Sequence, residues 1–254
     1  MTINQAFEIL KDAGGIRAAR IITDNIKNLS HIRVWFIARA LRRGTPVAKI
    51  IYKKWFYGLC FYTDKHTLDP RPDTETLVSA VIADDPKKPK ILDLGTGTGC
   101  IIISLVKNIH GANGVAVDIS RGAIRAACRN VATYKLNDKI KIIRGNFANP
   151  KIIKEKFDII VSNPPYIARG DGRVDAGAMH DPKLALYADK NGTAAYEQIA
   201  KNAKNWIKRG GKIYLEIGAG AETRVQKIFA SNGWKFIRAE KDLGDITRVL
   251  IFTI

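Results

Sequence analysis

The sequence predicts an α/β fold: a mostly parallel sheet with helices on both faces, joined to a small helical unit at the N-terminus. From about residue 73, short apolar runs typical of buried strands alternate with segments of helical periodicity. Two of these strand-like runs are followed at once by a turn rich in glycine or proline, as at the rim of such a sheet. The size also fits, because 254 residues, 46% of them hydrophobic, suffice for one large domain plus a small one.

Residues 1–55 are predicted to form a helical N-terminal domain of three or four short helices. Thr2 is placed to cap the first helix, and a glycine pair is expected to end it. Ser30 is placed to cap a later helix. Residues 56–72 begin with an aromatic, strand-like run and are expected to link this unit to the rest of the chain.

Residues 73–254 form the second predicted domain, in which strands and helices alternate. Its strands are expected over 89–94, 114–118, 139–143, 157–161 and 212–217, with two closing strands over 234–239 and 248–254. Its helices are expected over 73–83 with Asp73 as the N-cap, over 100–108, after Ser120, and over about 192–208 and 221–231. Ligands of such sheets bind beyond the carboxyl ends of the strands, so residues that directly follow a strand are the site candidates.

The cysteines and histidines give no sign of disulfides or of a metal site. Cys60, Cys100 and Cys128 are odd in number and lack the spacing of metal ligands, which favours reduced thiols in a cytoplasmic protein. The four histidines are scattered, so no metal site is expected. The N-terminus lacks the pattern of a signal peptide, and no apolar span is long enough to cross a bilayer.

The net charge of +18 predicts affinity for an acidic partner, either nucleic acid or an acidic protein. Residues 1–60 carry 11 Lys and Arg against 3 Asp and Glu, so a net +8 lies in less than a quarter of the chain. The alternative is a lysine-rich, solvated surface with no dedicated partner.

A glycine-rich turn follows the strand expected over 89–94 and carries the cofactor prediction. Glycines at alternate positions permit a tight turn and a close approach of the backbone to a ligand. Asp118 ends the next strand, 23 residues after Gly95, where it is placed to accept hydrogen bonds from both ribose hydroxyls of an adenosine group. The pattern G-x-G-x-G favours S-adenosylmethionine over a dinucleotide, the alternative being a turn that binds no ligand. The turn residues predicted to bind the cofactor are Gly95, Thr96, Gly97, Thr98 and Gly99.

Three further residues near this rim are candidates for cofactor contacts. Asp93 either bonds to the glycine-rich turn or faces the methionine part of the cofactor. Asn146 and Phe147 follow the third strand, where an amide is placed to bond the adenine amino group and a ring to stack on the base. The alternative for Asn146 is turn chemistry within its own loop.

The tetrapeptide Asn163-Pro164-Pro165-Tyr166 follows the strand expected over 157–161 and carries the prediction of catalysis. An amide or aromatic amine is a poor nucleophile because its nitrogen lone pair is conjugated. The Asn163 side-chain oxygen and the Pro164 carbonyl offer two acceptors that would hold both N–H bonds and aim the lone pair at a methyl group. The prolines stiffen the backbone, and Tyr166 is expected to pack against the planar group.

With the glycine-rich turn upstream, these residues predict methyl transfer to a planar nitrogen. Asn163, Pro164 and Tyr166 are the predicted catalytic residues, and Pro165 joins them in the predicted substrate site. The alternative is a plain turn, since Asn-Pro and Pro-Pro are both turn signals.

The motifs, in this order, resemble those of the HemK/PrmC-type peptide chain release factor glutamine methyltransferases. The resemblance spans about residues 44–254, and 68–75 are similar to the motif that opens the family's catalytic domain. Later motifs of the family are matched by Asp181-Pro182, Gly192 and the run Leu215-Glu216-Ile217-Gly218. A sister family that acts on a ribosomal protein shares Asn-Pro-Pro-Tyr but opens with Pro-Arg-Ser-Pro. Arg71 is followed here by Pro72-Asp73-Thr74-Glu75, which favours the release-factor branch.

The resemblance implies a Rossmann-like, seven-stranded S-adenosylmethionine-dependent methyltransferase sheet whose last strand is antiparallel. It implies methylation of the glutamine side-chain amide in the Gly-Gly-Gln loop of class 1 peptide chain release factors. Residues 1–55 would then be a substrate-docking domain and 73–254 the catalytic domain. On this pattern 95–99, Asp118, Phe147 and Asn163 hold the cofactor, and 163–166 hold the glutamine amide. Nucleic acid is not required, and a weak contact through the basic N-terminal region stays open.

Two other functions stay open on the sequence alone. A nucleic-acid methyltransferase that acts on an amino group of adenine or guanine shares the catalytic loop and suits the positive charge. It must extrude a duplex base to reach it, which demands a larger recognition region. The second is a binding module that docks on the ribosome or RNA through residues 1–60 and has lost catalysis, which the intact glycine-rich turn and Asn163 oppose.

Overall fold

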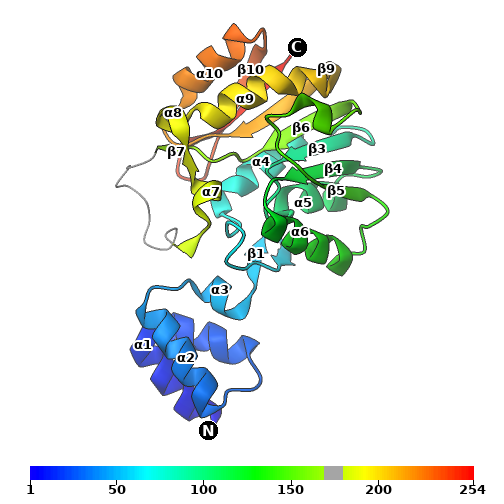
Figure 1. Cartoon of the computed structure of the whole chain (residues 1–254). Coiled ribbons are helices and arrows are strands. Elements are labelled where there is room, and N and C mark those ends of the chain that lie inside the picture. The colour runs from blue at the N-terminus through cyan, green and yellow to red at the C-terminus, as the bar shows by residue number, and fades with distance from the viewer. Residues whose placement is uncertain (169–179) are drawn as a thin grey trace.

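The computed structural model describes residues 1–168 and 180–254. A group of helices at the N-terminus is followed by a short hairpin and then by an α/β unit built on one large sheet (Figure 1). The structure confirms the predicted fold class, including the helices at the N-terminus.

The N-terminal helices are α1 (Ile3–Asn25), α2 (His31–Arg42) and α3 (Val47–Ile51). Thr2 caps α1 as predicted, because its hydroxyl accepts from the Gln5 amide while the Gln5 side chain accepts from the Thr2 amide. Ser30 caps α2 by accepting from the Arg33 amide at 3.3 Å. Gly15 has a φ of 85° inside α1 and divides it into two helical segments, which matches the break expected at the glycine pair.

A hairpin of β1 (Lys54–Phe56) and β2 (Leu59–Phe61) follows the helices. It leads through an extended segment into α4 (Pro72–Ala83). The expected N-cap of this helix is wrong: Pro72 occupies the first helical position, where its missing N–H costs nothing, and this places Arg71 at the N-cap. Asp73 lies in the first turn instead, and its carboxylate pairs with Arg248 at 2.9 Å.

The large sheet has seven strands in the order β10-β11-β9-β6-β3-β4-β5. The final strand β11 is antiparallel to both of its neighbours, and the strands from β9 to β5 are parallel, as the family resemblance implied. The strands are β3 (Lys90–Leu94), β4 (Asn113–Asp118), β5 (Ile140–Arg144), β6 (Phe157–Ser162), β9 (Ile207–Glu216), β10 (Lys235–Lys241) and β11 (Thr247–Thr253).

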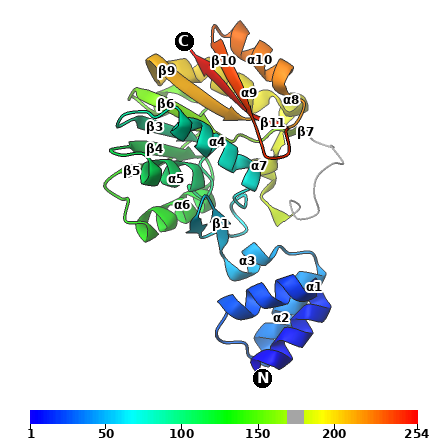
Figure 2. The same ribbon diagram turned by 180° about the vertical axis from the view of Figure 1, so that it is seen from behind.

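Two apolar cores flank this sheet. On one face α4, α5 (Cys100–Asn108) and α6 (Arg121–Thr133) contribute to a core with alternate side chains of the strands, and Figure 2 shows these helices in front of the sheet. On the other face α9 (Ala194–Asn202) and α10 (Glu222–Ser231) pack around the buried Trp206 and Trp234. The shorter elements are η1 (Pro150–Ile152), β7 (Ile167–Ala168), α7 (Lys183–Leu186), β8 (Tyr187–Ala188), α8 (Asp189–Gly192) and η3 (Ala203–Asn205).

Two absences apply to the part of the chain that the structure describes. There, no helix combines the length and the apolar character needed to cross a bilayer. Nor do three or more His, Cys, Asp or Glu side chains gather in a group able to hold a metal ion within residues 1–168 and 180–254.

Candidate active site

The glycine-rich turn and the Asn-Pro-Pro-Tyr tetrapeptide leave the sheet side by side. Each follows one of two neighbouring parallel strands, β3 and β6, in which Leu94 pairs with Ser162. The Ser162 hydroxyl donates to the Leu94 carbonyl at 2.7 Å and fixes the two strand ends together. Both turns therefore lie at the same rim of the sheet, where ligands of doubly wound folds bind.

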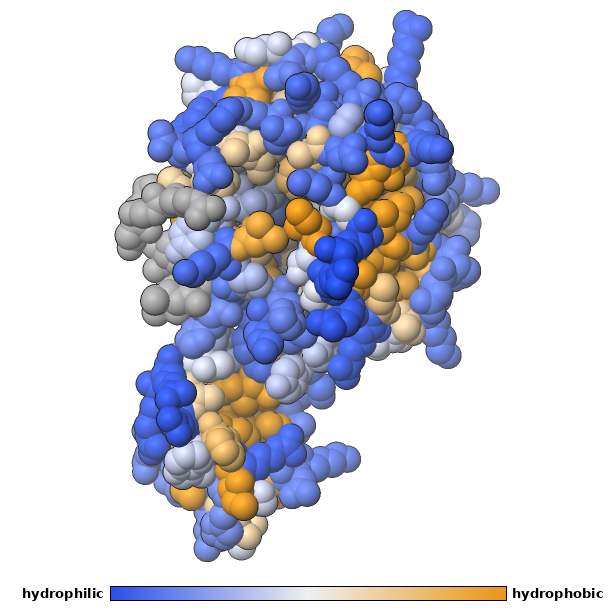
Figure 3. All heavy atoms as spheres, in the orientation of Figure 1, coloured by the Kyte–Doolittle hydropathy of each residue, from blue (hydrophilic) through white to orange (hydrophobic). Residues whose placement is uncertain are grey.

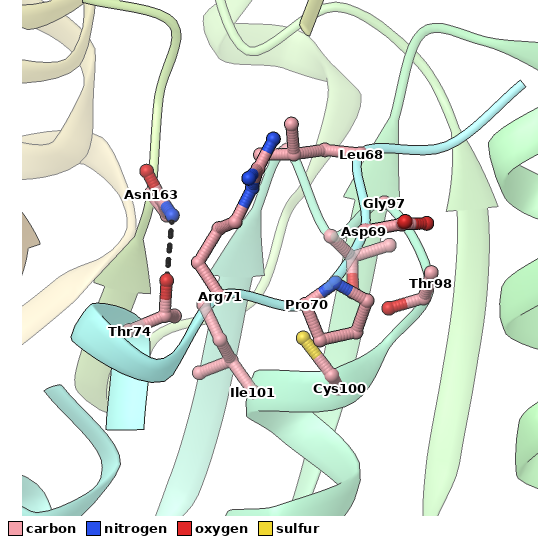
Figure 4. A pocket seen from close by; sticks show the side chains of 12 residues that line it. Leu68, Asp69, Pro70, Arg71, Thr74, Gly97, Thr98, Cys100, Ile101 and Asn163 are labelled. Atoms are coloured by element: carbon pink, nitrogen blue, oxygen red, sulfur yellow. Dashed lines mark hydrogen bonds between the residues drawn. The ribbon is translucent and has the colours of Figure 1, made fainter. Parts of the chain in front are cut away.

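A pocket opens between the two turns (Figure 4). Its cavity volume is about 40 Å³, and the space free of protein atoms is about 360 Å³ when open solvent at its mouth is included. The segment that runs from the hairpin into α4 forms the remaining wall. The residues that line the pocket are Leu68, Asp69, Pro70, Arg71, Thr74, Gly95, Thr96, Gly97, Thr98, Cys100, Ile101 and Asn163.

The glycine-rich turn exposes its backbone to open space. Gly95 and Gly97 have φ angles of 75° and 57°, which favour glycine, and a Cβ at either position would meet no heavy atom within 4 Å. Gly99 also has a positive φ of 80°, but its Cβ would lie 3.2 Å from Ile103, so it is closely packed as well. The amides of Gly95 and Thr96 both donate to the Val117 carbonyl, at 2.9 and 3.0 Å, and tie the turn to the end of β4.

Asp118 stands beside this turn with capacity to bind a ligand. Its Oδ1 accepts from the Ser120 amide at 2.8 Å and its Oδ2 from the Gly97 amide at 2.9 Å. Burial raises the pKa of this carboxyl, and the backbone amides partly oppose the rise. Because a carboxylate has about four lone-pair positions, each oxygen keeps one to accept a hydroxyl hydrogen. The two oxygens therefore suit the pair of ribose hydroxyls expected there.

Asp93 bonds to the glycine-rich turn, one of the two roles left open by the sequence. Its side chain is fully buried, and its Oδ2 accepts from the Thr96 hydroxyl at 2.6 Å. Burial raises the pKa of Asp93 to about 7, and the nearby Asp118 adds to the rise. Its Oδ1 has no hydrogen-bond partner among the described residues.

Asn146 and Phe147 lie at the same rim but do not line the pocket. The Gly145 amide donates to the Asp118 carbonyl at 2.8 Å, which brings their loop next to Asp118. Asn146 is exposed, and its side-chain oxygen accepts from the Ala148 amide at 2.8 Å, which is turn chemistry. Phe147 is half-buried and packs against the core on the α9 side.

Asn163 is the residue of the tetrapeptide that lines the pocket. Its Nδ2 donates to the Thr74 hydroxyl at 3.0 Å, drawn as a dashed line in Figure 4. An asparagine amide has one donor end and one acceptor end, so this bond leaves the Oδ1 acceptor to face outward. No donor from the described residues is bonded to that oxygen. The side chain thus offers the acceptor that the sequence argument required.

Tyr166 lies beyond Asn163 and serves through packing. A Cβ at Gly218 would come within 2.9 Å of its ring, and a Cβ at Gly192 within 2.3 Å of its carbonyl oxygen. Burial raises the pKa of Tyr166 to about 12, with Glu216 adding to the rise and Arg248 opposing it, so the phenol is neutral near pH 7. Tyr166 also lines a second hollow with 218–221 and Arg224. Pro164 is buried and Pro165 half-buried between these two residues.

Three side chains that the sequence argument gave no role belong to this site. Arg71 at the N-cap of α4 and Thr74 in its first turn both line the pocket. Glu216 ends β9 and is buried beneath Thr74 and Asn163, with its Oε2 lacking a hydrogen-bond partner among the described residues. The sequence offered one signal for Glu216, which is its position as an acidic residue at the end of an apolar, strand-like run.

We expect Glu216 to make stability depend on pH. Burial raises its pKa from 4.5 to about 7, while Thr74, Arg248 and Asn163 oppose the rise and Asp73 adds to it. The folded state therefore holds this proton more tightly, so its contribution to stability is complete below pH 4.5 and is lost as the pH rises to 7. Glu216→Gln should gain up to about 3 kcal/mol relative to wild type between pH 5 and 8, since one pKa unit corresponds to about 1.4 kcal/mol.

Urea unfolding of both proteins at several pH values measures this difference. The raised pKa of Asp93 makes stability depend on pH in the same direction. Asp93 is present in both proteins, so its contribution cancels in the difference between them. A difference in unfolding free energy that stays constant from pH 5 to 8 would contradict the assignment.

Comparison with known proteins places the chain among methyltransferases. The family described as Methyltransferase small domain matches residues 66–180. A bifunctional methyltransferase of Rickettsia felis is 40% identical over 239 residues, which cover 82% of this chain and 45% of that protein. The chain thus spans about half the length of the bifunctional relative.

A second relative matches over most of its own length. The release factor glutamine methyltransferase of Agrobacterium fabrum is 39% identical over 222 residues, which cover 82% of this chain and 74% of that protein. Among solved structures, a methyltransferase from Pyrococcus furiosus superposes with a TM-score of 0.53 at 18% identity, over 70% of this chain and 82% of that chain, and supports the fold. The sequence identity to the Agrobacterium protein confirms what the motifs predicted: the chain belongs to the release factor glutamine methyltransferase family.

Proposed function

We propose that this protein transfers a methyl group from S-adenosylmethionine to the side-chain amide nitrogen of the glutamine in the Gly-Gly-Gln loop of class 1 peptide chain release factors. One observation carries the proposal: the glycine-rich turn and Asn163 line the same pocket. Family membership supports the substrate, because relatives over most of this chain are release factor glutamine methyltransferases.

The residues present fit the cofactor. The open space at Gly95 and Gly97 accommodates a ligand against the backbone, and Asp118 keeps lone pairs for the ribose hydroxyls. Thr96, Thr98 and Gly99 complete the turn. Bound S-adenosylmethionine supplies an electrophilic methyl group on a sulfonium. Asn146 and Phe147 stay candidates for the adenine, with Phe147 the better one because the Asn146 oxygen is engaged in its own loop.

The chain's own residues prepare the acceptor nitrogen. The Asn163 oxygen and the Pro164 carbonyl accept hydrogen bonds from the two N–H groups of the glutamine amide. These hydrogen bonds reduce the conjugation of the nitrogen lone pair. Thr74 holds the Asn163 amide so that its oxygen, and not its nitrogen, faces the substrate. Pro165 and Tyr166 hold the loop in shape and cover the planar amide. Alignment of this kind contributes up to about 7–11 kcal/mol to lowering a barrier.

The N-terminal helices supply the docking surface in this proposal. Ile32, Trp35 and Phe36 on α2 are 72%, 53% and 60% exposed, and Figure 3 shows hydrophobic side chains at the surface of these helices among hydrophilic ones. The helix carries three arginines among 31–42 and no acidic residue within that range, which suits an acidic protein. A cytoplasmic location fits both the substrate and the unpaired cysteines.

Asp118→Ala should chiefly weaken cofactor binding. The substitution removes the carboxylate expected to hold the ribose, and it also frees the Gly97 and Ser120 amides that now donate to it. Loss of charge-assisted hydrogen bonds of about 1.5–3 kcal/mol raises the dissociation constant roughly 10–100-fold. Titration calorimetry with S-adenosylhomocysteine measures this. An unchanged dissociation constant would remove the ribose assignment.

The function itself is tested by a methyl-transfer assay. The protein is incubated with S-adenosylmethionine labelled in the methyl group and, in separate reactions, with a class 1 release factor, the same factor with alanine in place of the Gly-Gly-Gln glutamine, and total RNA. We expect label in the intact factor alone. Label in RNA instead would favour the nucleic-acid methyltransferase, which the net charge of +18 supports. No label in any substrate, with no cofactor binding, would favour a binding module.

A further inference from the structure

Lys49 lies where three separate parts of the chain meet. It belongs to α3, whose Val47, Ile50 and Ile51 pack against the apolar core of the N-terminal helices. Its own side chain leaves that core and is only 8% exposed. It is thus a buried lysine that reaches from the N-terminal helices into the rest of the protein.

The Lys49 ammonium group is fully engaged there. Its Nζ lies 2.7 Å from Asp69 Oδ1 and 3.0 Å from Asp181 Oδ1. It donates to the Thr63 hydroxyl at 3.2 Å and to the carbonyls of Asp64 and Thr67 at 2.8 and 2.5 Å. These partners belong to the segment after the hairpin, over 63–69, and to the segment that begins at 180. Lysine has three N–H donors, which match these three hydrogen-bond acceptors, and the two carboxylates are its ion-pair partners.

The two carboxylates connect Lys49 to the pocket. Asp69 and Arg71 both line the pocket (Figure 4). The Arg71 Nη2 lies 2.9 Å from Asp181 Oδ2. Asp69 and Asp181 are both buried. Lys49 and Arg71 therefore balance two buried carboxylates, and removal of Lys49 leaves one negative charge without compensation. An uncompensated buried charge forces its surroundings to rearrange.

A second contact joins the same two parts of the chain. The His180 ring Nε2 lies 3.2 Å from the Arg43 carbonyl oxygen, next to the ion pair of Lys49 with Asp181. The end of the N-terminal helices is thus bound twice to the segment at 180–181, and once more through Asp69 to the pocket wall.

We propose that Lys49 is a positioning residue that braces the pocket wall over 68–71 against the N-terminal helices. The brace keeps Asp69 and Arg71 in place and fixes the pocket relative to the surface on which the protein substrate docks. The docking part of this inference rests on the proposed function, whereas the bracing part rests on the contacts alone.

The test compares Lys49→Met with a matched control, Lys53→Met. Both substitutions remove one positive charge, but Lys53 is exposed and donates only to Asn25 among the described residues. Hydrogen exchange of the amides over 63–71 is measured first, and we expect it to become faster in Lys49→Met and to stay at the wild-type rate in Lys53→Met. This readout needs neither cofactor nor substrate.

Kinetics with a release factor give the second readout. We expect Lys49→Met to lower kcat about 10–100-fold, more than it changes KM, since a small misplacement of a site costs up to about 10²-fold. The double variant Lys49→Met with Asp69→Asn should recover part of that kcat, because it removes the uncompensated carboxylate and keeps an acceptor for the Thr63 hydroxyl. Lys53→Met should keep the wild-type kcat.

Wild-type exchange over 63–71 in a folded Lys49→Met protein would overturn the proposal, as would a kcat loss that the double variant leaves unchanged. If Lys49→Met does not fold, Asp69→Asn is measured in the same way, because it keeps the pair of Lys49 with Asp181. Wild-type exchange and wild-type kcat in that variant would then overturn the brace. A wild-type enzyme that does not methylate release factors would refute the proposed function, while the exchange data would still decide the role of Lys49.

Discussion

Asn163→Ala is expected to lower turnover of the release factor by about 10²–10³-fold, the cost of losing one preorganised partner of the reacting group. The reason is geometric: Thr74 holds the amide donor of Asn163 at 3.0 Å, so the side-chain oxygen is fixed as an acceptor at the pocket. The substitution removes that acceptor and leaves the glycine-rich turn and Asp118 untouched. Cofactor affinity should therefore change far less than kcat. Single-turnover methylation with labelled cofactor measures the first, and calorimetry the second.

Asn163→Asp is the matched control for this prediction. A carboxylate of the same shape still accepts from N–H, so the loss of turnover should be milder than with alanine. It also brings a second negative charge next to the buried Glu216, whose pKa is already raised to about 7. Activity of the Asp variant should consequently be higher at low pH, where Glu216 is protonated. If Asn163→Ala turned over substrate at the wild-type rate, the amide-gripping role would be wrong.

The sequence predicted the fold well wherever the signal was local. Thr2, Ser30 and Ser120 each cap the helix that follows, because a short side chain accepts from an amide two or three residues later. The central parallel strands β3, β4 and β6 were visible as apolar runs because they are buried on both faces. The prediction of a methyl-transfer site also depended on local pattern, because a turn that directly follows a strand must lie at the sheet's rim.

Residues distant in the chain determine the two element boundaries that the sequence predicted wrongly. Asp73 was expected to cap α4, but Pro72 shifts the helix start and Arg248 takes the Asp73 carboxylate. The strand β9 begins at Ile207 and not near 212, because a register shift opposite Phe157 lets the earlier residues pair with β6.

Several roles within the site depend on the same kind of distant contact. Thr74 acquires its function from Asn163, 89 residues later, and Lys49 from Asp181. The role of Glu216 likewise depends on its contacts with Thr74 and Asn163. No periodicity or local motif encodes such pairs, because their members are brought together only by the folded structure.

Gly192→Ala is expected to lower kcat on the order of 10²-fold, although the residue touches no substrate in the proposed mechanism. Gly192 has a φ of 87°, and a Cβ there would lie 2.3 Å from the Tyr166 carbonyl oxygen and 3.1 Å from its carbonyl carbon. Both contacts are to backbone, which has no free rotamer with which to retreat. The tetrapeptide must therefore move, and with it the acceptor carbonyl of Pro164 and the oxygen of Asn163. Cofactor affinity should stay near the wild-type value, since the glycine-rich turn is held separately by Val117.

Gly210→Ala separates this displacement from backbone strain alone. Gly210 has a φ of 75°, so alanine there carries a comparable left-handed penalty of about 1–2 kcal/mol, but its Cβ would meet nothing within 4 Å. It lies in β9, away from the residues that line the pocket. Gly210→Ala should therefore lose about 1–2 kcal/mol in urea unfolding and keep its turnover, whereas Gly192→Ala should lose at least that much stability, because of the added close contact, and lose turnover as well. Equal kcat in the two variants would mean that the tetrapeptide tolerates the displacement, and that the close contact at Tyr166 does not set the geometry of methyl transfer.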